Sequence, residues 1–304
     1  MIPKSGYRFS EKIMLQQEPM AELQTVDVSP AAIGRSEHLA APATSRWRRI
    51  EPTALGAASI VVVLAVWQFL PDVLPLKPGT KLFFAVPSEI AGTLWQMFAT
   101  GAIWAPLGVS AGAFAVGLGL AIIAGLPLGI LLGRSPALSA MFDPFITAFN
   151  ATPRLVFLPL LMLWLGIGLW CKVAIVFLGA VFPLLINTYE GVRNADKLLI
   201  NVVRSFGANE WDIARLIVVP NSLPFIVVGL RLAIGRAILG VVVAEFFGAQ
   251  DGLGVVMVRA ASEFKVDVVF AGLIVFAALS LAMTSLVKLV EDHMSRWRPV
   301  TRNR

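Results

Sequence analysis

The sequence predicts an all-α polytopic membrane protein with about six transmembrane helices. Of its 304 residues, 57% are hydrophobic and only 14% are charged, whereas a soluble domain carries about 25% charged residues. The mean hydropathy is +0.79. Because one helix needs about 20 mostly apolar residues to cross lipid, the chain has room for one bundle of spans and for no second large domain.

The charged residues and the cysteine content exclude several classes of protein. The formal net charge is +6, but the basic residues lie beside apolar runs, which is typical of membrane orientation and not of a nucleic-acid partner. The single cysteine, Cys171, excludes an internal disulfide, and the two histidines, His38 and His293, lie far apart. The sequence therefore predicts no metal site and no cofactor.

The chain divides by composition into a tail, a membrane domain and a second tail. Residues 1–50 mix charges with Pro, Ser and Ala and predict a disordered cytoplasmic N-terminal tail. The first apolar run begins too far along the chain for a cleavable signal peptide. Residues 51–292 predict the transmembrane domain, and residues 293–304 predict a basic cytoplasmic C-terminal tail.

Apolar runs of sufficient length mark the spans, and one of them is interrupted by proline. The third run consists of a short helix to Asn150, a kink at Pro153 and a span through Leu165. A shorter helix from Ser88 lies between the first two spans, and a loop that contains Gly248, Gly252 and Gly254 joins the last two. The predicted spans are 54–74, 106–132, the broken run 137–165, 170–188, 223–246 and 266–289.

The distribution of Lys and Arg predicts the orientation in the membrane. Arg46, Arg48 and Arg49 precede the first span, which favours a cytoplasmic N-terminus. Counting spans from there places residues 133–136, residues 189–222 and the C-terminus on the same side. These segments are rich in basic residues, so both termini are predicted to be cytoplasmic.

The long polar loop, residues 189–222, predicts two short amphipathic helices. Asp196 is positioned to cap the first, which ends at Gly207. Asn209 is positioned to cap the second, which is expected to end before Pro220. Apolar side chains lie on one face of the first helix at helical spacing: Leu199, Val202, Val203 and Phe206. Such helices are suited to docking into a groove of another protein.

This loop resembles the cytoplasmic signature of the permeases of ATP-binding-cassette importers. That signature is a Gly, then nine residues, then Ile-x-Leu-Pro. In the run SFGANEWDIARLIVVPNSLP, Gly207, Ile217 and Pro220 match, with Val219 at the Leu position. The family's leading Glu-Ala-Ala is replaced by Asn201-Val202-Val203. The runs LPLLMLWLGIG (158–168) and VVAEFFGAQDGLG (242–254) look like the nitrate, sulfonate and taurine branch, and the resemblance covers residues 85–292.

The resemblance implies the permease subunit of an importer in the bacterial inner membrane. Its substrate would be a small anion, such as an aliphatic sulfonate, taurine or nitrate. Its partners would be an ATPase subunit, a periplasmic substrate-binding protein, a second copy of the chain and membrane lipid. The loop would be the ATPase-coupling segment, with Trp211 as an anchor in the ATPase groove. The coupling residues implied are Gly207, Ala208, Asn209, Glu210, Trp211, Ile213, Ile217 and Pro220.

Polar residues inside the spans are candidates for the translocation pathway. Arg154 lies in an apolar stretch, and an ionisable residue inside a membrane usually marks function. An anionic substrate could pass it; alternatively, Arg154 pairs with Asp143 or Glu245, or snorkels along a helix end, for structure alone. The predicted pathway residues are Arg154, Asn150, Thr152 and Glu245.

Arg231 and Arg236 are expected near the cytoplasmic end of the fifth span. There they would serve orientation or an interface and not the pathway.

Two other classes of protein are weighed against the importer permease. An enzyme is disfavoured because the chain lacks a nucleophile–base pair, a metal cluster and a GxxxxGK[ST] phosphate loop, so the chain itself is predicted to be non-catalytic. A secondary transporter or channel for a small anion is the nearer alternative. It would be expected to hold several carboxylates near mid-membrane, and only Asp143 and Glu245 approach that description.

Overall fold

The structure, a computed structural model, describes residues 47–73 and 83–295. The chain divides into two units, Met1–Ile60 and Val61–Arg304. Of the first unit, only the helical residues from Trp47 onward are described. Almost all of the predicted N-terminal tail and most of the predicted C-terminal tail therefore lie outside the described residues.

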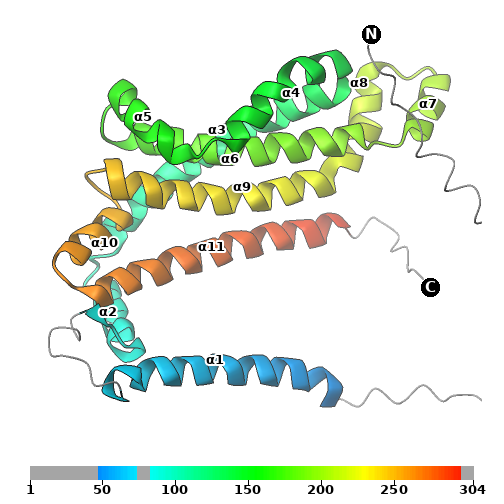
Figure 1. The fold of residues 1–304 in the computed structure, drawn as a ribbon. Helices are drawn as coiled ribbons and strands as arrows, with labels where there is room; N and C mark the ends of the chain where they lie inside the picture. Colours follow the sequence, from blue (N-terminus) through cyan, green and yellow to red (C-terminus); the bar gives the residue numbers. More distant parts are fainter. Residues whose placement is uncertain (1–46, 74–82, 296–304) are drawn as a thin grey trace, which may run out of the picture. The chain divides into compact units, whose positions relative to one another are not determined.

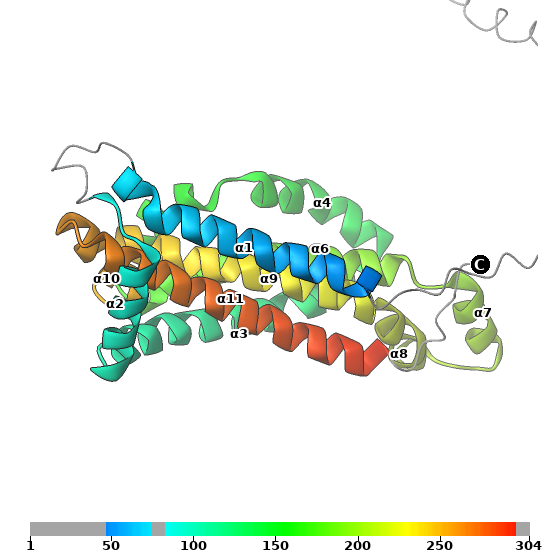
Figure 2. The ribbon, with the colours of Figure 1, turned by 90° about the horizontal axis from the view of Figure 1, so that it is seen from below.

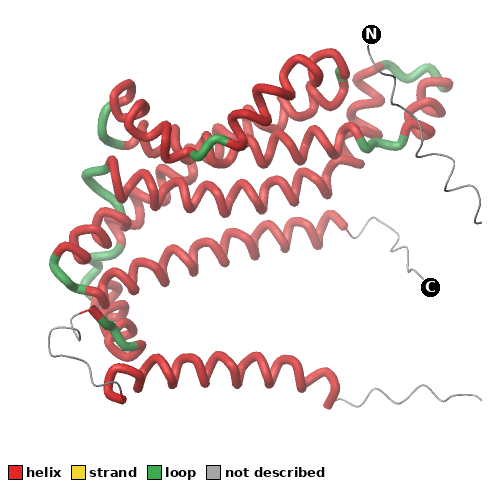
Figure 3. The backbone as a smooth tube through the Cα atoms, in the orientation of Figure 1, coloured by secondary structure: helices red, strands yellow, loops and turns green. Residues whose placement is uncertain are grey.

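Every regular element within the described ranges is helical (Figure 3), which confirms the predicted fold class. Two short segments depart from α-helical geometry: η3 is a 3-10 turn and η4 is π-helical. The elements are α1 (Trp47–Val73), α2 (Pro87–Ala99), α3 (Trp104–Arg134), α4 (Pro136–Ala151), η3 (Arg154–Phe157), α5 (Leu158–Leu165), α6 (Leu169–Arg193), α7 (Lys197–Ser205), α8 (Glu210–Ile213), η4 (Ala214–Val218), α9 (Val219–Gly248), α10 (Leu253–Ser262) and α11 (Val266–Ser295).

The membrane spans agree with the prediction of about six. Five helices in the described residues are long and apolar enough to cross a membrane. The sixth candidate is the broken run, in which α4 and the following η3–α5 helix meet at an angle of 91°. Thr152 and Pro153 lie at this break, where proline cannot continue the helical hydrogen bonding. The predicted kink is confirmed.

Helix α6 lies between α3 and α9 and forms the centre of the larger unit (Figures 1 and 2). Its side chains Val176, Ala180 and Leu184 are completely buried. They belong to one apolar core together with Ala121 of α3 and Ala237 of α9. These three helices therefore pack as a layered group with α6 in the middle.

Glycines bring the backbones of α3 and α6 into direct contact. A Cβ atom added at Gly129 would lie 2.8 Å from the carbonyl oxygen of Leu185, and one at Gly117 would lie 3.0 Å from that of Val173. Small residues at a helix contact let backbones approach closely in lipid, where no hydrophobic effect drives helices together. The glycine-rich character of the second span is thus explained by its packing on α6.

Three segments differ from the sequence prediction. Helix α2 begins at Pro87 and not at Ser88, because Glu89 accepts a hydrogen bond of 3.2 Å from the Val86 amide. The stretch expected to be a loop contains α10, a short helix with Leu253 and Met257 buried. The helix expected to end at Pro220 continues through that residue into α9, and the π-helical segment η4 (Ala214–Val218) directly precedes the proline, whose missing N–H interrupts regular α-helical bonding.

Replacing Gly129 by alanine is expected to lower the free energy of unfolding by about 1–3 kcal/mol, because the new Cβ would overlap the α6 backbone. Gly119→Ala on the same helix is the matched control, since a Cβ there meets no atom within 4 Å. The control should be neutral or slightly stabilising. Thermal unfolding in detergent, followed by tryptophan fluorescence, compares the two variants. Equal melting temperatures would contradict the close contact.

Candidate functional site

The polar loop forms a helical hairpin at one end of the bundle. This α7–α8 hairpin (residues 196–220) begins where Asp196 Oδ1 accepts a hydrogen bond of 2.8 Å from the Leu198 amide. Asn209 caps α8 through its Oδ1, which accepts from the Asp212 amide at 2.9 Å. Gly207 between the two helices has φ +87°, a conformation that glycine adopts without strain. Both predicted caps and the glycine turn are confirmed.

The second arm of the hairpin is continuous with the following span. From Glu210 to Gly248 the chain forms one helical stretch of 39 residues. At 1.5 Å per residue this stretch is about 58 Å long, whereas the hydrocarbon core of a membrane is about 30 Å thick. Part of the stretch must therefore lie outside the hydrocarbon, and the charged residues Glu210, Asp212 and Arg215 assign that part to its first turns.

An apolar cluster and an ion-pair network seat the hairpin on the bundle. Ile213 and Val218 are buried against Val192 at the end of α6. Glu210 accepts hydrogen bonds from Arg204 of α7 at 2.8 Å and from Arg134 at the end of α3 at 2.7 Å. The hydrogen bond from Arg204, reinforced by Arg134, holds the pKa of the Glu210 carboxyl below its usual range. The Glu210 carboxyl therefore stays charged at neutral pH and remains paired with both arginines.

The outer face of the hairpin exposes large apolar side chains. Phe206 is 87% exposed and Trp211 is 72% exposed, and Leu198 and Leu216 are also largely exposed. The predicted coupling residues divide between the two sides. Gly207, Asn209, Glu210, Trp211 and Pro220 are exposed, Ala208 and Ile217 are half-buried, and Ile213 is buried.

Phe206 and Leu198 complete the exposed apolar surface but are absent from the predicted coupling set. The helical spacing of the first helix already placed Phe206 on an apolar face. Only the structure reveals that this face is left open, because burial depends on packing that spacing does not specify.

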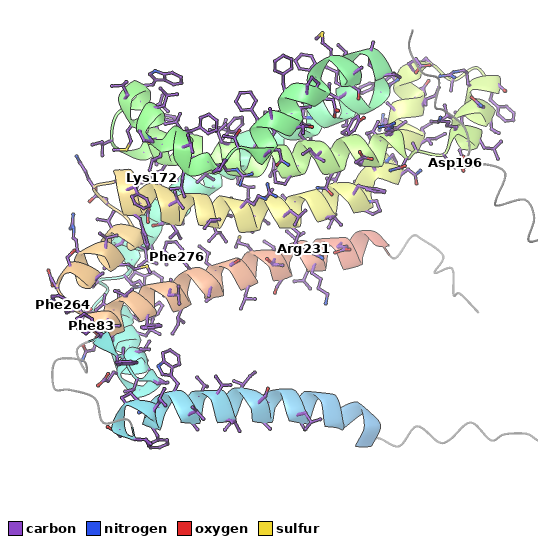
Figure 4. The ribbon with its side chains drawn as sticks, in the orientation of Figure 1. Phe83, Lys172, Asp196, Arg231, Phe264 and Phe276 are labelled. Atoms are coloured by element: carbon purple, nitrogen blue, oxygen red, sulfur yellow. The ribbon has the colours of Figure 1, made fainter. Side chains whose placement is uncertain are left out.

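A buried ion pair lies at the opposite end of the bundle. Lys172 lies in the first turn of α6, at the end of the bundle opposite to Asp196 of the hairpin (Figure 4). Lys172 Nζ is 3.2 Å from Glu245 Oε1 of α9, and the side chains are 3% and 0% exposed. Ser110 of α3 donates to the same carboxylate at 2.8 Å. One carboxylate thus connects the three central helices.

The loop after α9 closes around this ion pair. The Gly254 amide donates to Glu245 Oε2 at 2.8 Å, and Lys172 donates to the carbonyl oxygen of Asp251. A Cβ at Gly252 would lie 2.0 Å from Glu245 Oε1, so only glycine fits beside the carboxylate. We call Ser110, Lys172, Glu245 and the loop 251–254 the polar knot.

The other predicted pathway residues gather near the break after α4. Arg154 Nε donates to the Leu178 carbonyl oxygen of α6 at 3.3 Å. Arg236 Nη1 of α9 donates to Asn150 Oδ1 at 3.2 Å. Thr152 donates back to Ala148 at 2.8 Å and thereby caps α4. Asn150, Thr152 and Arg154 are thus brought together, whereas Glu245 lies apart in the polar knot.

Two expectations about the arginines are corrected by the structure. Arg154 forms no ion pair with Asp143 or Glu245; its described hydrogen bond goes to a backbone carbonyl, and Glu245 pairs with Lys172. Arg236 lies near the middle of α9 and not near its end, because that helix runs from Val219 to Gly248. A charge at mid-span costs at least about 2.5–3.5 kcal/mol, so its retention there calls for a functional explanation.

A helical bundle with five or six candidate spans and a structured hairpin defines a polytopic membrane protein. The chain belongs to the family of binding-protein-dependent transport system inner membrane components, whose sequence profile matches residues 125–296. These proteins are the non-catalytic permease subunits of ATP-binding-cassette importers. They work with a separate ATPase and with a substrate-binding protein. The secondary transporter or channel considered from sequence is therefore excluded.

Individual relatives and one solved structure support this placement. A Bacillus subtilis (strain 168) protein named as an aliphatic sulfonates transport permease, SsuC, is 33% identical over 78% of this chain and 85% of its own length. The taurine transport system permease protein TauC of Escherichia coli (strain K12) is 29% identical over 83% and 92%. A chain of the MetNI methionine ABC transporter, in an inward facing conformation, has the same fold, with a TM-score of 0.54. It is 20% identical, and the match covers 61% of this chain and 93% of that one.

Breaking the buried pair on one side is expected to be strongly destabilising. Lys172→Met or Glu245→Gln alone should cost about 3–5 kcal/mol, because each leaves a buried charge without its partner. The double variant should cost clearly less than the sum, since no buried charge is then left without its partner.

The exposed pair Glu263 and Lys265 supplies the matched control. Their side chains are 58% and 61% exposed, so Glu263→Gln and Lys265→Met should each cost less than about 1 kcal/mol. Unfolding in mixed micelles measures both cycles. Strictly additive losses at Lys172 and Glu245 would contradict their coupling.

Proposed function

We propose that this permease carries a small organic anion across the inner membrane and is driven through its α7–α8 hairpin by the ATPase. The observation that carries this proposal is the continuity of the hairpin with α9. A force applied to the hairpin acts directly on a helix of the central group, because α8, η4 and α9 form one helical stretch.

The orientation follows from the basic residues at the two ends. At the hairpin end lie Arg134, Arg193, Lys197, Arg204 and Arg215. The described residues at the knot end hold fewer: Lys172, Arg259 and Lys265, of which Lys172 pairs with Glu245 and Lys265 pairs with Glu263. Since basic residues concentrate on the cytoplasmic side, we assign the hairpin and both chain termini to the cytoplasm and the polar knot to the outer side.

The exposed hairpin face supports ATPase docking. Phe206 and Trp211 are large, exposed side chains on short helices, and aromatic anchors of this kind dominate many protein interfaces. Ile213 faces the bundle, so it holds the hairpin in place while Trp211 and Phe206 meet the partner.

A second copy of the chain would complete the pathway. Helix α4 buries none of its side chains, and it exposes Phe142, Phe145 and Phe149. Lipid can cover the aromatic rings, but the polar groups of Asn150 and Arg154 at the end of this helix need a polar neighbour. We therefore assign this side of the molecule to a homodimeric pathway, with lipid around its outer surface.

The substrate assignment combines the relatives with the charge of the span interior. The two relatives are named for aliphatic sulfonates and for taurine, and both cargoes carry a sulfonate group on a small carbon chain. Arg154, with Asn150 and Thr152, supplies the positive and hydrogen-bonding groups that such an anion requires. Glu245 contributes indirectly, by holding together the helices that frame the pathway.

Co-reconstitution tests the function. The chain and its ATPase are reconstituted in vesicles, and the binding protein is supplied on the knot side. Labelled ethanesulfonate or taurine should accumulate on the hairpin side only when ATP is present on that side. Uphill uptake by the chain alone would contradict the proposal, and so would ATP-driven uptake of a neutral solute with no uptake of either sulfonate.

Trp211→Ala is expected to weaken binding of the ATPase by about 30-fold, as for an interface anchor worth at least about 2 kcal/mol. Trp95→Ala is the matched control, because Trp95 is 75% exposed on α2 and lies outside the hairpin. Both variants should keep the wild-type melting temperature. Binding of the purified ATPase to immobilised permease measures the effect, and equal affinities for the two variants would refute the docking assignment.

A further inference from the structure

Arg154 and Arg236 differ from two other cations of the described spans, Lys172 and Arg231. Lys172 pairs with Glu245, and Arg231 of α9 pairs with Glu291 of α11. In the same described ranges, Arg154 donates to a backbone carbonyl and Arg236 donates to a neutral amide. No carboxylate within ion-pair distance neutralises either guanidinium there.

The two arginines meet across one glycine of α6. A Cβ at Gly179 would lie 3.0 Å from the backbone oxygen of Arg236 and 3.9 Å from Cδ of Arg154. Glycine at this position lets α9 and the stem of Arg154 approach the same point from two sides. Arg236 Nη1 donates to Asn150, four residues before Arg154, so both side chains lie at the break after α4. Two cations without a carboxylate partner at one place favour an anion there.

The pair lies at the depth of the hydrocarbon. Leu178, which anchors Arg154, is nine residues into α6, or about 14 Å from its knot end. Arg236 is twelve residues before Gly248, or about 18 Å from the same end. A transported solute must therefore pass this level in the interior of the spans.

Most of the hydrogen-bonding capacity of the two side chains remains available. A guanidinium group has five N–H donors, and each arginine gives one hydrogen bond to the described residues. The planar fork of arginine matches groups that carry several oxygens on one centre. Asn150, whose oxygen accepts from Arg236, still has its amide hydrogens to donate.

Stacked aromatic rings border the same break. The ring of Phe149 lies 6.2 Å from that of Phe157 and 6.1 Å from that of Phe182, measured between centroids. Phe149 directly precedes Asn150, and Phe182 is one turn beyond Leu178 on α6. An apolar surface is thus available beside the arginines for a short carbon chain.

We propose that Arg154, Arg236 and Asn150 form an oxyanion site that holds the sulfonate-type head group of the solute inside the membrane. This inference rests on the proposed function and adds two features to it. It makes Arg236 a specificity residue, and it makes the permease itself, in addition to the binding protein, selective for anions.

The test uses the complete complex in proteoliposomes and labelled ethanesulfonate as the probe. R154Q and R236Q should each lower ATP-driven uptake at least ten-fold, and R154Q/R236Q should reduce it to background. R154K/R236K keeps the charge and should retain a measurable part of the uptake. The matched control is R231Q/E291Q, which removes a paired cation from the same helix and should keep uptake within three-fold of wild type.

ATP hydrolysis in the absence of the binding protein separates function from folding. It should stay within two-fold of wild type in R154Q/R236Q; a parallel loss of hydrolysis and uptake would assign the arginines to structure and overturn the site. If the double variant does not assemble with the ATPase, the two single variants decide by the same criteria. Wild-type uptake in R154Q/R236Q would overturn the site and leave the proposed function intact, whereas a wild type that transports no sulfonate would overturn both.

Discussion

The close contact of α6 with α3 and α9 is the constraint on which the rest of the structure depends. Glycines such as Gly129 and Gly240 bring the backbones to within van der Waals distance, so no side chain separates them. At the knot end, Glu245 is bonded to Ser110 of α3 and to Lys172 of α6. Because unsatisfied polar groups are costly in lipid, this carboxylate cannot leave its partners easily, and the three helices form a single body.

In the function proposed above, this body carries motion from one face of the membrane to the other. The α7–α8 hairpin is attached to it twice, through the Ile213 cluster and through the Glu210–Arg134 pair. One arm of the hairpin also continues directly into α9. On that proposal, a displacement of the hairpin by an ATPase would be carried along α9 to the loop 251–254. The arginine pair lies between the two ends, where the solute would be released or held as the body tilts.

The spans and the hairpin were predictable from sequence, whereas the pairing of polar groups was not. Long apolar runs and the caps Asp196 and Asn209 are local features, so the helices around them could be located. The partner of Glu245 could not be deduced, because Lys172 is 73 residues away. In the sequence, Lys172 looks like an ordinary basic residue of a loop. Helix α10 was missed because it is short and follows glycines. Arg236 was misplaced because its charge was interpreted as an orientation signal, although the predicted span 223–246 already placed it near mid-span.

The central claim is that the hairpin and the outer loop move together. Electron paramagnetic resonance distances between labels at Ser205→Cys and Asp251→Cys, both exposed positions, test it most directly in a Cys171→Ala chain diluted with unlabelled copies. The account predicts the same distance distribution in the nucleotide-free complex and in the complex trapped with ATP. A distance that changes between the two states would show that the helix bends between hairpin and loop, and would contradict transmission through a single rigid body.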